Sequence, residues 1–481
     1  MRSLLLALPL LGGCHAIAGL DELVPGGHSA GASDVEWLRV FGDANNQRIT
    51  ALGVDKNGSI VVAGDFHGAI DFGGEKLLAD DDDVFVAKLA PDGRRLWSRR
   101  SGGSFRVEVN GLALSANGSV IIAGSFDPRL VIGDFVLDGG TGADAFVAEL
   151  DLNGNPRWAR QLGGNGHQVA RGVAVDANGN VVVAGDFDQE LVIKDGGKTD
   201  AKLAGVGQMF LAKFRGTGEY LWSSGYGDDQ PQRAAVVAAA GSDQMVFAGT
   251  LNGGAMLADH PLASHGGADL FLAKLDGGGG HLWSGALGDA QSNCHEWCEV
   301  ALAIDADGRV LMTGAFTGAI DFGGTKLVAA LDADVFLAAF DGFGEAGKPR
   351  NLWATRFGDI APQRPYGLAV VGRSEPVVSG GFRGSIDLGA ATYQNDDYAH
   401  DVFVVGYRSD GTVAWSRQWP ITSAVPDRAE PGGPRVASGP DRSVVVAGSF
   451  HGALRVGDVA FSATGGGADY DAFIVKLAPR P

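Results

Sequence analysis

A tryptophan recurs along this chain at nearly equal intervals, and this repeat constrains the fold more than any other feature. Successive copies lie 60 to 70 residues apart. A glycine stands five residues after the tryptophan in six of the seven copies, and Pro420 takes its place in the last. An internal period of this kind predicts an array of similar supersecondary units. The repeated tryptophans are Trp37, Trp97, Trp158, Trp222, Trp283, Trp353 and Trp415.

Two apolar runs keep the same phase in every copy. One run ends in glycine, as at residues 60–64, and the other centres on a phenylalanine. An aspartate lies two residues before that phenylalanine in six copies, and Gln208 is the exception. The phenylalanines are Phe85, Phe146, Phe210, Phe271, Phe336, Phe403 and Phe473.

Each copy predicts four β-strands. In the first copy we expect strands at about 49–54, 60–66 and 84–89, and a fourth that carries Trp97. Asn57-Gly58 and Asp92-Gly93 predict tight turns, because these residues tolerate positive φ. The second and third runs are apolar at nearly every position, as expected for sheets covered on both faces. The sequence therefore predicts an all-β fold, a seven-bladed β-propeller with four antiparallel strands per blade.

The two ends of the chain are expected to complete one blade together. The last copy ends soon after its third strand and has no tryptophan strand of its own. The strand that carries Trp37, at about 35–40, precedes the first copy. The N-terminal strand is therefore predicted to close the last blade, which ties the two ends together and leaves no open edge in the ring.

Three segments resemble the bacterial seven-bladed propeller repeats known as SBBP repeats. They are Asp83 to Leu89, Gly93 to Trp97, and Asn178 to Gly185. The resemblance covers residues 35–481 and implies a propeller fold in an envelope or secreted setting. It implies no particular activity, because the functions of these repeats are poorly defined.

The glycine and hydrophobic contents agree with a fold of many short strands, and the net charge disfavours one class of partner. Glycine makes up 76 of 481 residues, and 45% of the residues are hydrophobic. This combination favours an ordered, turn-rich fold over disorder. The formal net charge is −19. An acidic surface repels phosphate backbones, so no nucleic-acid partner is expected.

The N-terminus predicts export and lipid anchoring. Arg2 precedes an apolar stretch from Leu4 to Leu11, which is too short to span a bilayer. Leu11-Gly12-Gly13-Cys14 resembles the lipobox of bacterial lipoproteins, which implies that residues 1–13 are a signal peptide and that Cys14 is lipidated. Residues 14–34 are then a flexible tether. His15, rather than an aspartate, follows the cysteine, which favours the outer membrane, at the cell surface or on the periplasmic face.

The tryptophans themselves are predicted to pack between blades. Four copies place an alanine, a glycine six residues later and a tryptophan four residues after that, beginning with Ala87, Gly93 and Trp97. This spacing is similar to the tryptophan-docking motif of quinoprotein dehydrogenases, in which the tryptophan packs against a neighbouring blade. The chain has no adjacent cysteine pair of the kind that quinoprotein catalysis uses. No cofactor is therefore expected.

Two acidic patterns invite a calcium interpretation. The turn at Asp55 to Gly58 begins like a calcium loop, but it lacks the third oxygen ligand and the distal glutamate. The run Asp80 to Asp83 is denser, and it is either a solvated acidic loop or a loose calcium site. No metal is expected.

Three arginines share one repeat position. Arg48, Arg233 and Arg364 each lie eleven residues after the repeated tryptophan, and each follows a glutamine. They fall between the fourth strand of one blade and the first strand of the next. They either pair within the loop with Asp43, Asp228 and Asp359, or contribute to an anion or acidic-glycan site on the rim.

The segment Cys294-His295-Glu296-Trp297-Cys298 is the largest departure from the repeat. With Cys14 lipidated, Cys294 and Cys298 are the remaining thiols, and an oxidising compartment favours a disulfide between them. Such a bond would present Trp297 on the rim. Trp297 is predicted either to contact a sugar or protein partner or to pack against the propeller.

These features predict a non-catalytic, monomeric cell-envelope lipoprotein whose propeller rim binds a protein or polysaccharide partner. It would meet the membrane through its lipid anchor only. The alternatives are a propeller enzyme acting on envelope or extracellular polysaccharide and a purely structural surface protein. An enzyme needs a pair of carboxylates outside the repeat pattern, whereas the aspartate that stands out is repeated. The insertions at 291–299 and 421–434 share one face, which favours binding.

Overall fold

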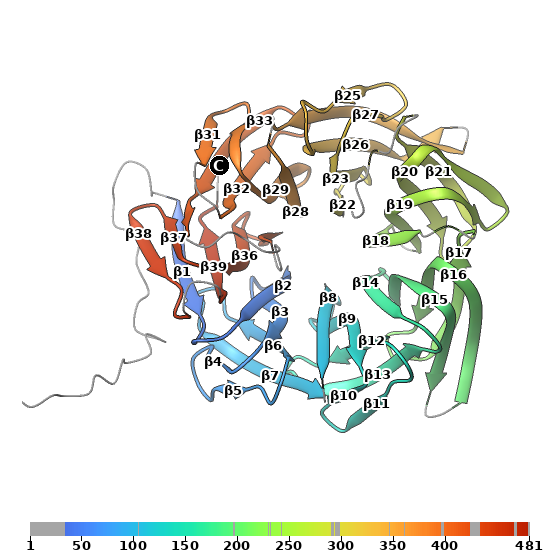
Figure 1. Cartoon of the computed structure of the whole chain (residues 1–481), viewed down its shortest axis with the longest axis horizontal. Helices are drawn as coiled ribbons and strands as arrows, with labels where there is room; N and C mark the ends of the chain where they lie inside the picture. The colour runs from blue at the N-terminus through green and yellow to red at the C-terminus, as the bar shows by residue number, and fades with distance from the viewer. Residues whose placement is uncertain are drawn as a thin grey trace, which may run out of the picture.

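The computed structural model describes residues 34–479, with gaps at 104, 196–197, 229, 231, 242, 290–292, 294–298, 346, 360, 396–398, 424–432 and 466–468. Its regular elements are all β-strands within these residues. No helix in this part of the chain is long and apolar enough to cross a membrane. The strands are arranged around a ring (Figure 1), which makes the chain a β-propeller.

The repeat unit is a set of four antiparallel strands that pair in chain order. The first three units are β2 (Gln47–Val54), β3 (Ile60–Phe66), β6 (Asp83–Leu89) and β7 (Arg95–Gly103); β8 (Arg106–Leu114), β9 (Val120–Asp127), β12 (Asp144–Leu150) and β13 (Pro156–Gly163); and β14 (Gln168–Val175), β15 (Val181–Asp195), β16 (Lys198–Phe214) and β17 (Tyr220–Tyr226). The next three are β18 (Arg233–Ala240), β19 (Gln244–Leu257), β20 (His260–Asp276) and β21 (His281–Leu287); β22 (Val300–Ile304), β23 (Val310–Phe316), β26 (Asp334–Glu345) and β27 (Lys348–Phe357); and β28 (Gln363–Val371), β29 (Glu375–Phe382), β32 (Asp401–Tyr407) and β33 (Val413–Trp419).

The final unit joins the two ends of the chain, as the sequence predicted. It consists of β35 (Arg435–Ser438), β36 (Val444–Phe450), β39 (Asp471–Leu477) and β1 (Val35–Phe41). β1 pairs antiparallel with β39, with Val40 opposite Phe473. The Ala478 N–H also donates to the Asp34 carbonyl at 2.6 Å. The N-terminal strand thus supplies the outer strand that this unit lacks.

Short outer hairpins connect the second and third strands of most units, where the sequence had suggested only glycine-containing connections. They are β4 (Ala69–Ile70) with β5 (Leu77–Leu78), β10 (Arg129–Ile132) with β11 (Phe135–Asp138), β24 (Ala319–Asp321) with β25 (Lys326–Val328), β30 (Gly384–Asp387) with β31 (Thr392–Asn395), and β37 (Ala453–Val456) with β38 (Val459–Ser462). Some of them pair with the preceding unit: β10 pairs with β7, and β37 pairs with β34 (Ile421–Thr422).

The apolar middle strands form the core between units. Every residue of β3, β6 and β12 is buried. One hydrophobic cluster joins Val86 of the first unit to Ile122 and Phe146 of the second. Burial on both faces explains why these strands are continuously apolar rather than alternating.

The repeated tryptophan packs against the next unit, which confirms the predicted docking. The Trp97 indole Nε1–H donates to the Leu152 carbonyl at 2.8 Å. A Cβ atom on Gly154 would lie 2.7 Å from the Trp97 ring, so that position requires glycine. The equivalent pairs are Trp37 with Gly93, Trp158 with Gly218, Trp222 with Gly279, Trp283 with Gly344, and Trp353 with Gly411.

The glycine five residues after each tryptophan has a partner within its own unit. In five units it lies against the aspartate that precedes the repeated phenylalanine by two residues. A Cβ on Gly163 would lie 2.3 Å from an Asp144 carboxylate oxygen. The same arrangement places Gly102 against Asp83 and Gly42 against Asp471. The two repeat positions are therefore complementary halves of one packing contact.

Replacing Gly154 by alanine tests the docking contact, and Gly179 provides a matched control. The two glycines have φ angles of 78° and 79°, but nothing lies within 4 Å of a Cβ at Gly179. Gly179→Ala should cost about 1 kcal/mol, the strain of a left-handed conformation. Gly154→Ala should cost about 1–3 kcal/mol more, because its methyl group would enter the Trp97 ring. Urea denaturation of both variants measures the difference, and equal losses would contradict the contact.

Candidate functional site

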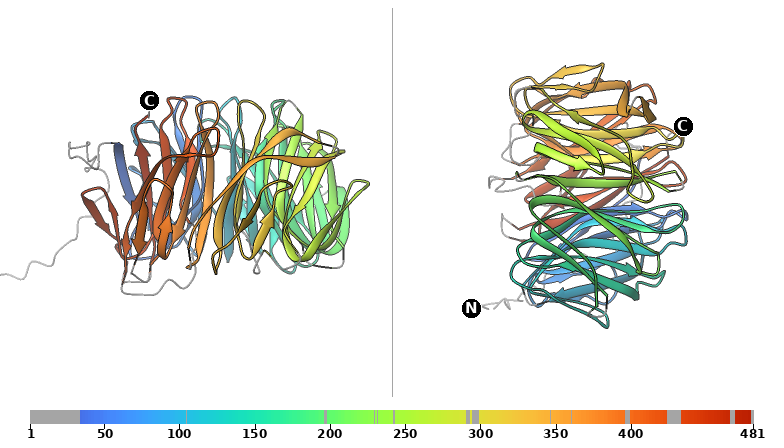
Figure 2. Two further views of the ribbon diagram at one scale, coloured as in Figure 1. Left: turned by 90° about the horizontal axis from the view of Figure 1, so that it is seen from above. Right: turned by 90° about the vertical axis from the view of Figure 1, so that its right-hand side faces the viewer.

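The candidate site lies where each unit's innermost strand begins. The first strands of the units, such as β2, β8, β14, β18, β22 and β28, lie nearest the centre of the ring (Figure 1). The strands run from one face of the disc to the other (Figure 2). Because the pairing is antiparallel, one face carries the connections into the first strand and those between the second and third strands. We call this the entry face.

Glutamine, rather than arginine, braces the loops that enter the first strands. Gln47 Nε2 donates to Asp43 Oδ1 at 2.7 Å, and Gln232 repeats this bond with Asp228 at 2.7 Å. Gln363 does the same with Asp359 at 3.1 Å. The predicted pairing of the repeated arginines with these aspartates is therefore wrong.

The reason for the error is strand alternation. Glutamine and arginine are consecutive, so they point to opposite sides of the strand, and only the glutamine turns into the loop. All three glutamines are buried, and Gln47 and Gln363 are fully so. The spacing of aspartate to glutamine, four residues in each loop, is the sequence signal that indicates this bond.

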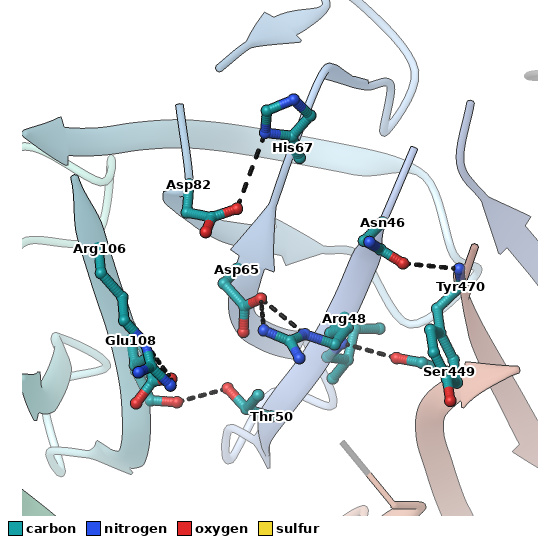
Figure 3. Close-up of polar contacts among 12 residues, drawn as sticks. Asn46, Arg48, Thr50, Asp65, His67, Asp82, Arg106, Glu108, Ser449 and Tyr470 are labelled. Atoms are coloured by element: carbon teal, nitrogen blue, oxygen red, sulfur yellow. Dashed lines mark hydrogen bonds and ion pairs between the residues drawn. The ribbon is translucent and has the colours of Figure 1, made fainter. Parts of the chain in front are cut away.

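Arg48 instead binds a carboxylate on the neighbouring strand. Its Nε donates to Asp65 Oδ2 at 2.7 Å, and Nη2 lies 2.6 Å from the same oxygen (Figure 3). Asp65 is 6% exposed. Burial raises the pKa of Asp65 to about 6, against the opposing effect of Arg48. Arg48 therefore neutralises a buried acid.

The neighbouring unit contributes further polar groups beside Arg48. Arg106 Nε donates to Glu108 Oε1 at 2.9 Å (Figure 3). Thr50 Oγ1 donates to the Val109 carbonyl at 2.5 Å, which joins the inner strands of the first two units. On the other side, the Ile49 N–H donates to Ser449 Oγ at 3.1 Å in the last unit. Inner strands of adjacent units are thus linked through side chains.

Arg233 and Arg364 belong to a second group of charges. Arg171 binds Asp186 through both Nε and Nη2, the latter at 3.1 Å. Arg233 interacts electrostatically with Arg171, Asp186 and Glu299. Arg364 Nη1 lies 3.9 Å from Glu299 Oε1. These residues come from successive units and interact through Asp186 and Glu299.

Arg435 extends this group and was not identified from the sequence. Its Nη1 donates to the Tyr366 carbonyl at 2.6 Å, and its charge interacts with Glu299. Its Nε is buried and has no hydrogen-bond partner in the described part of the chain. Arg435 follows the insertion at 421–434, which contains no glutamine, so its position relative to the other arginines could not be read from the repeat.

The remaining predicted site residues lie outside the described residues. These are the lipidation site Cys14, the predicted disulfide Cys294–Cys298 and the rim residue Trp297. In sequence, Trp297 lies two residues before Glu299. Their predicted roles therefore stay predictions.

The acidic run has specific partners. Asp80 and Asp83 both bind Arg100, and Asp83 is fully buried. Asp82 Oδ1 lies 3.7 Å from His67 Nδ1 (Figure 3). Among the described residues, no group of three or more histidines, cysteines or acids is placed to hold a metal.

Comparison with known proteins supports the repeat fold. No protein-family model matches the chain. A 113-residue stretch is 30% identical to an uncharacterized WD repeat-containing protein of Acanthamoeba polyphaga mimivirus, covering 22% of this chain and 8% of that protein. A 246-residue stretch is 27% identical to the regulatory protein FlaEY of Caulobacter vibrioides, covering 48% and 25%. The matches thus span a quarter or less of these curated relatives.

Three solved structures resemble this chain at low identity. BamB from Moraxella catarrhalis is 12% identical, with a TM-score of 0.33 over 92% of this chain and 93% of that one. A glucose dehydrogenase is 10% identical, with a TM-score of 0.35 over 92% and 99%. A puromycin hydrolase mutant is 13% identical, with a TM-score of 0.35 over 85% and 59%. The chain is a β-propeller repeat protein.

The prediction that the chain is not an enzyme is corrected by these comparisons. The glucose dehydrogenase and the puromycin hydrolase are enzymes by name. Their similarity to this chain is distant and assigns it no reaction.

Replacing Arg48 by glutamine tests the buried ion pair. The pKa of Asp65 is raised to about 6 in the fold, so its contribution to stability is present at low pH and is lost as pH rises through 6. Without Arg48 the ionised carboxylate has no cation beside it. Arg48→Gln should therefore cost about 1–3 kcal/mol at pH 8, and less at pH 5, where Asp65 is protonated.

The control for this measurement is Arg106→Gln. Arg106 is 69% exposed and pairs with Glu108, which is 29% exposed, so its loss should cost less than about 1 kcal/mol at either pH. Urea denaturation at pH 5 and pH 8 provides both values. A loss in Arg48→Gln that is equal at the two pH values would show that Asp65 does not titrate as expected.

Proposed function

We propose that this chain is an exported, lipid-anchored envelope protein whose entry face binds a protein or polysaccharide partner. The observation that carries the proposal is the concentration of departures from the repeat on this face. The insertions at 291–299 and 421–434 both lie between the fourth strand of one unit and the first strand of the next. The three arginines that share a repeat position but have different partners lie at the starts of first strands, in β2, β18 and β28.

The propeller is proposed to have seven blades. The support is one four-stranded unit for each repeated tryptophan, with β1 completing the unit of β35, β36 and β39. A closed ring presents one continuous entry face. The SBBP-type repeat is proposed on the motifs at 83–89, 93–97 and 178–185.

The lipid anchor is proposed at Cys14, with signal-peptide cleavage before it. The protein is then a monomer at the outer membrane, on the cell surface or the periplasmic face, and it meets the membrane through the lipid alone. The net charge of −19 disfavours nucleic acid as a partner.

Replacing Cys14 by serine tests the anchor. The wild-type protein should incorporate labelled fatty acid and fractionate with membranes, because the acyl chains supply the membrane affinity. Cys14→Ser should lose the label and become soluble in the exported fraction. A variant that remains membrane-bound would contradict the lipid anchor.

Replacing Trp297 by alanine tests the proposed rim. A partner present at about 100 times its Kd should stabilise the fold by about 2.7 kcal/mol. Purified envelope polysaccharides and solubilised envelope proteins should raise the melting temperature of the wild type, and Trp297→Ala should lose most of this shift. Such a loss is expected because aromatic side chains on loops commonly carry binding energy.

The matched control is Phe343→Ala. Phe343 is 88% exposed, and it lies near the end of β26, close to the turn into β27, on the face opposite the entry face. This variant should respond to the partner as the wild type does. A panel in which no fraction stabilises the protein, or in which Phe343→Ala loses as much as Trp297→Ala, would contradict a binding role for the rim.

A further inference from the structure

Two histidine rings lie face to face at the tip of a hairpin on the outer side of the ring. The paired ends of β19 and β20, residues 254–263, form this hairpin. The His260 ring stacks on the His281 ring at the start of β21, with centroids 3.8 Å apart and planes inclined by 16°. β20 and β21 lie in the outer part of the ring (Figure 1). The stack therefore joins the hairpin tip to the outer strand of its own unit.

The same contact is made by other kinds of residue in the first two units. His281 lies two residues before the repeated tryptophan of its unit. At that position in the first unit, Arg95 Nε donates to the Gly73 carbonyl of the hairpin tip at 3.0 Å. In the second unit, a Cβ on the hairpin residue Gly133 would lie 3.0 Å from Pro156. The unit of β18 to β21 differs from both, because here two rings that titrate near neutral pH meet at the contact.

The surroundings of the stack suit one positive charge better than two. His260 Nδ1 lies 2.8 Å from Asp259 Oδ1, so a protonated His260 has a carboxylate beside it. His281 Nε2 instead faces the neutral hydroxyl of Ser284 at 2.9 Å. Burial and the charge of His260 lower the pKa of His281 from its ordinary value of 6.5, against the opposing effect of Asp259. A second proton therefore places like charges on two rings in contact.

The elements beside the stack carry few other charges. The charged residues on the turns next to β21 are Asp276, which precedes it, and Glu345 and Lys348, which join β26 to β27. The carboxylate of Asp276 accepts two backbone N–H groups within its own turn, at 2.9 and 2.8 Å. The charges that act on the pKa of His281 are those of His260 and Asp259, on the hairpin itself.

The hairpin is anchored by apolar side chains and is strained at its tip. Leu257 and Leu262 are buried in a cluster with Tyr226 of β17, in the preceding unit. Ala258, in the turn, has a φ of 55°, a left-handed conformation that is unusual for a residue other than glycine. The contact with β21 therefore holds in place a turn that is not relaxed by itself.

We propose that His260 and His281 form an acid-sensitive latch, which holds the hairpin tip on β21 at neutral pH and releases it when both rings are protonated. The two rings are in van der Waals contact, so their charges would repel at short range. The His260 side chain is 53% exposed and can take up a proton from solvent. Release would uncover Leu257 and Leu262 on the outer side of the ring. This device is separate from the entry face and does not depend on its partner.

The direction of the pH dependence follows from proton linkage. The pKa of His281 is lower with the hairpin closed than its ordinary value of 6.5, so opening the hairpin takes up a proton below that pH. The closed hairpin is therefore favoured above pH 6.5, and it loses this advantage as the pH falls toward the pKa that His281 has in the stack.

Hydrogen exchange at pH 8 and pH 5, read by mass spectrometry and corrected for the intrinsic exchange rate at each pH, tests the latch. In the wild type, protection of residues 252–263 should fall about fivefold or more at pH 5, because the protonated stack favours local opening. The hairpin at 129–138 contains no histidine and should keep its protection. It is an internal reference in the same molecule.

His281→Phe and His260→Phe provide the decisive comparison, because phenylalanine keeps an aromatic ring in the stack and cannot be protonated. A single imidazolium against a phenylalanine face is attractive. Both variants should therefore protect residues 252–263 equally at the two pH values. The control His67→Phe changes a histidine that lies beside Asp82 in the first unit, and its hairpin should respond to pH as the wild type does.

Protection of the buried residues 270–275 of β20 shows that each variant is folded. Equal protection of residues 252–263 at both pH values in the wild type would overturn the proposal. A folded phenylalanine variant that loses as much protection at pH 5 as the wild type would overturn it as well. Each of the two histidines has its own variant, so one variant that fails to fold leaves the other to decide.

Discussion

The contact between a tryptophan of one unit and a glycine of the next is the interaction on which the rest of the structure depends. It has two parts, an indole N–H bound to a turn carbonyl at 2.8–3.4 Å and a ring face against a residue without a side chain. The glycine has positive φ in the turn between the third and fourth strands, so one residue satisfies both the turn and the docking. Because each unit docks on its neighbour, the first strands at the ring centre are held in fixed positions relative to one another.

A second repeated contact fixes the other end of each outer strand. The glycine after the tryptophan packs on a buried aspartate, and burial raises the pKa of Asp144, Asp334 and Asp471, the last to about 6. A repeated carboxylate with a raised pKa could be mistaken for a catalytic acid. Its environment argues otherwise, since Asp471 accepts bonds from the Thr464 N–H at 3.0 Å and hydroxyl at 2.8 Å, all within the packing contact.

The repeat made the fold predictable, but it did not predict the partners of the charged residues at the candidate site. Strand positions, the tryptophan docking and the closing strand β1 follow from spacing alone, because they recur or complete a recurring set. The partner of Arg48 could not be predicted in this way. Asp65 lies seventeen residues away on the next strand, and only the register of β2 against β3, which sets Arg48 opposite Asp65, brings them together. Outer hairpins such as β10 with β11 are equally weak in sequence, since their strands have four residues each.

Arginines at the same repeat position have different partners in different units, and such differences indicate where a function specific to this chain lies. Arg48 faces a buried acid of its own unit, whereas Arg364 shares Glu299 with Arg233 and Arg435. Glu299 follows directly on the Cys294–Cys298 insertion, the segment that departs furthest from the repeat. Glu299 therefore lies where the segment that departs furthest from the repeat meets arginines from the first strands of other units.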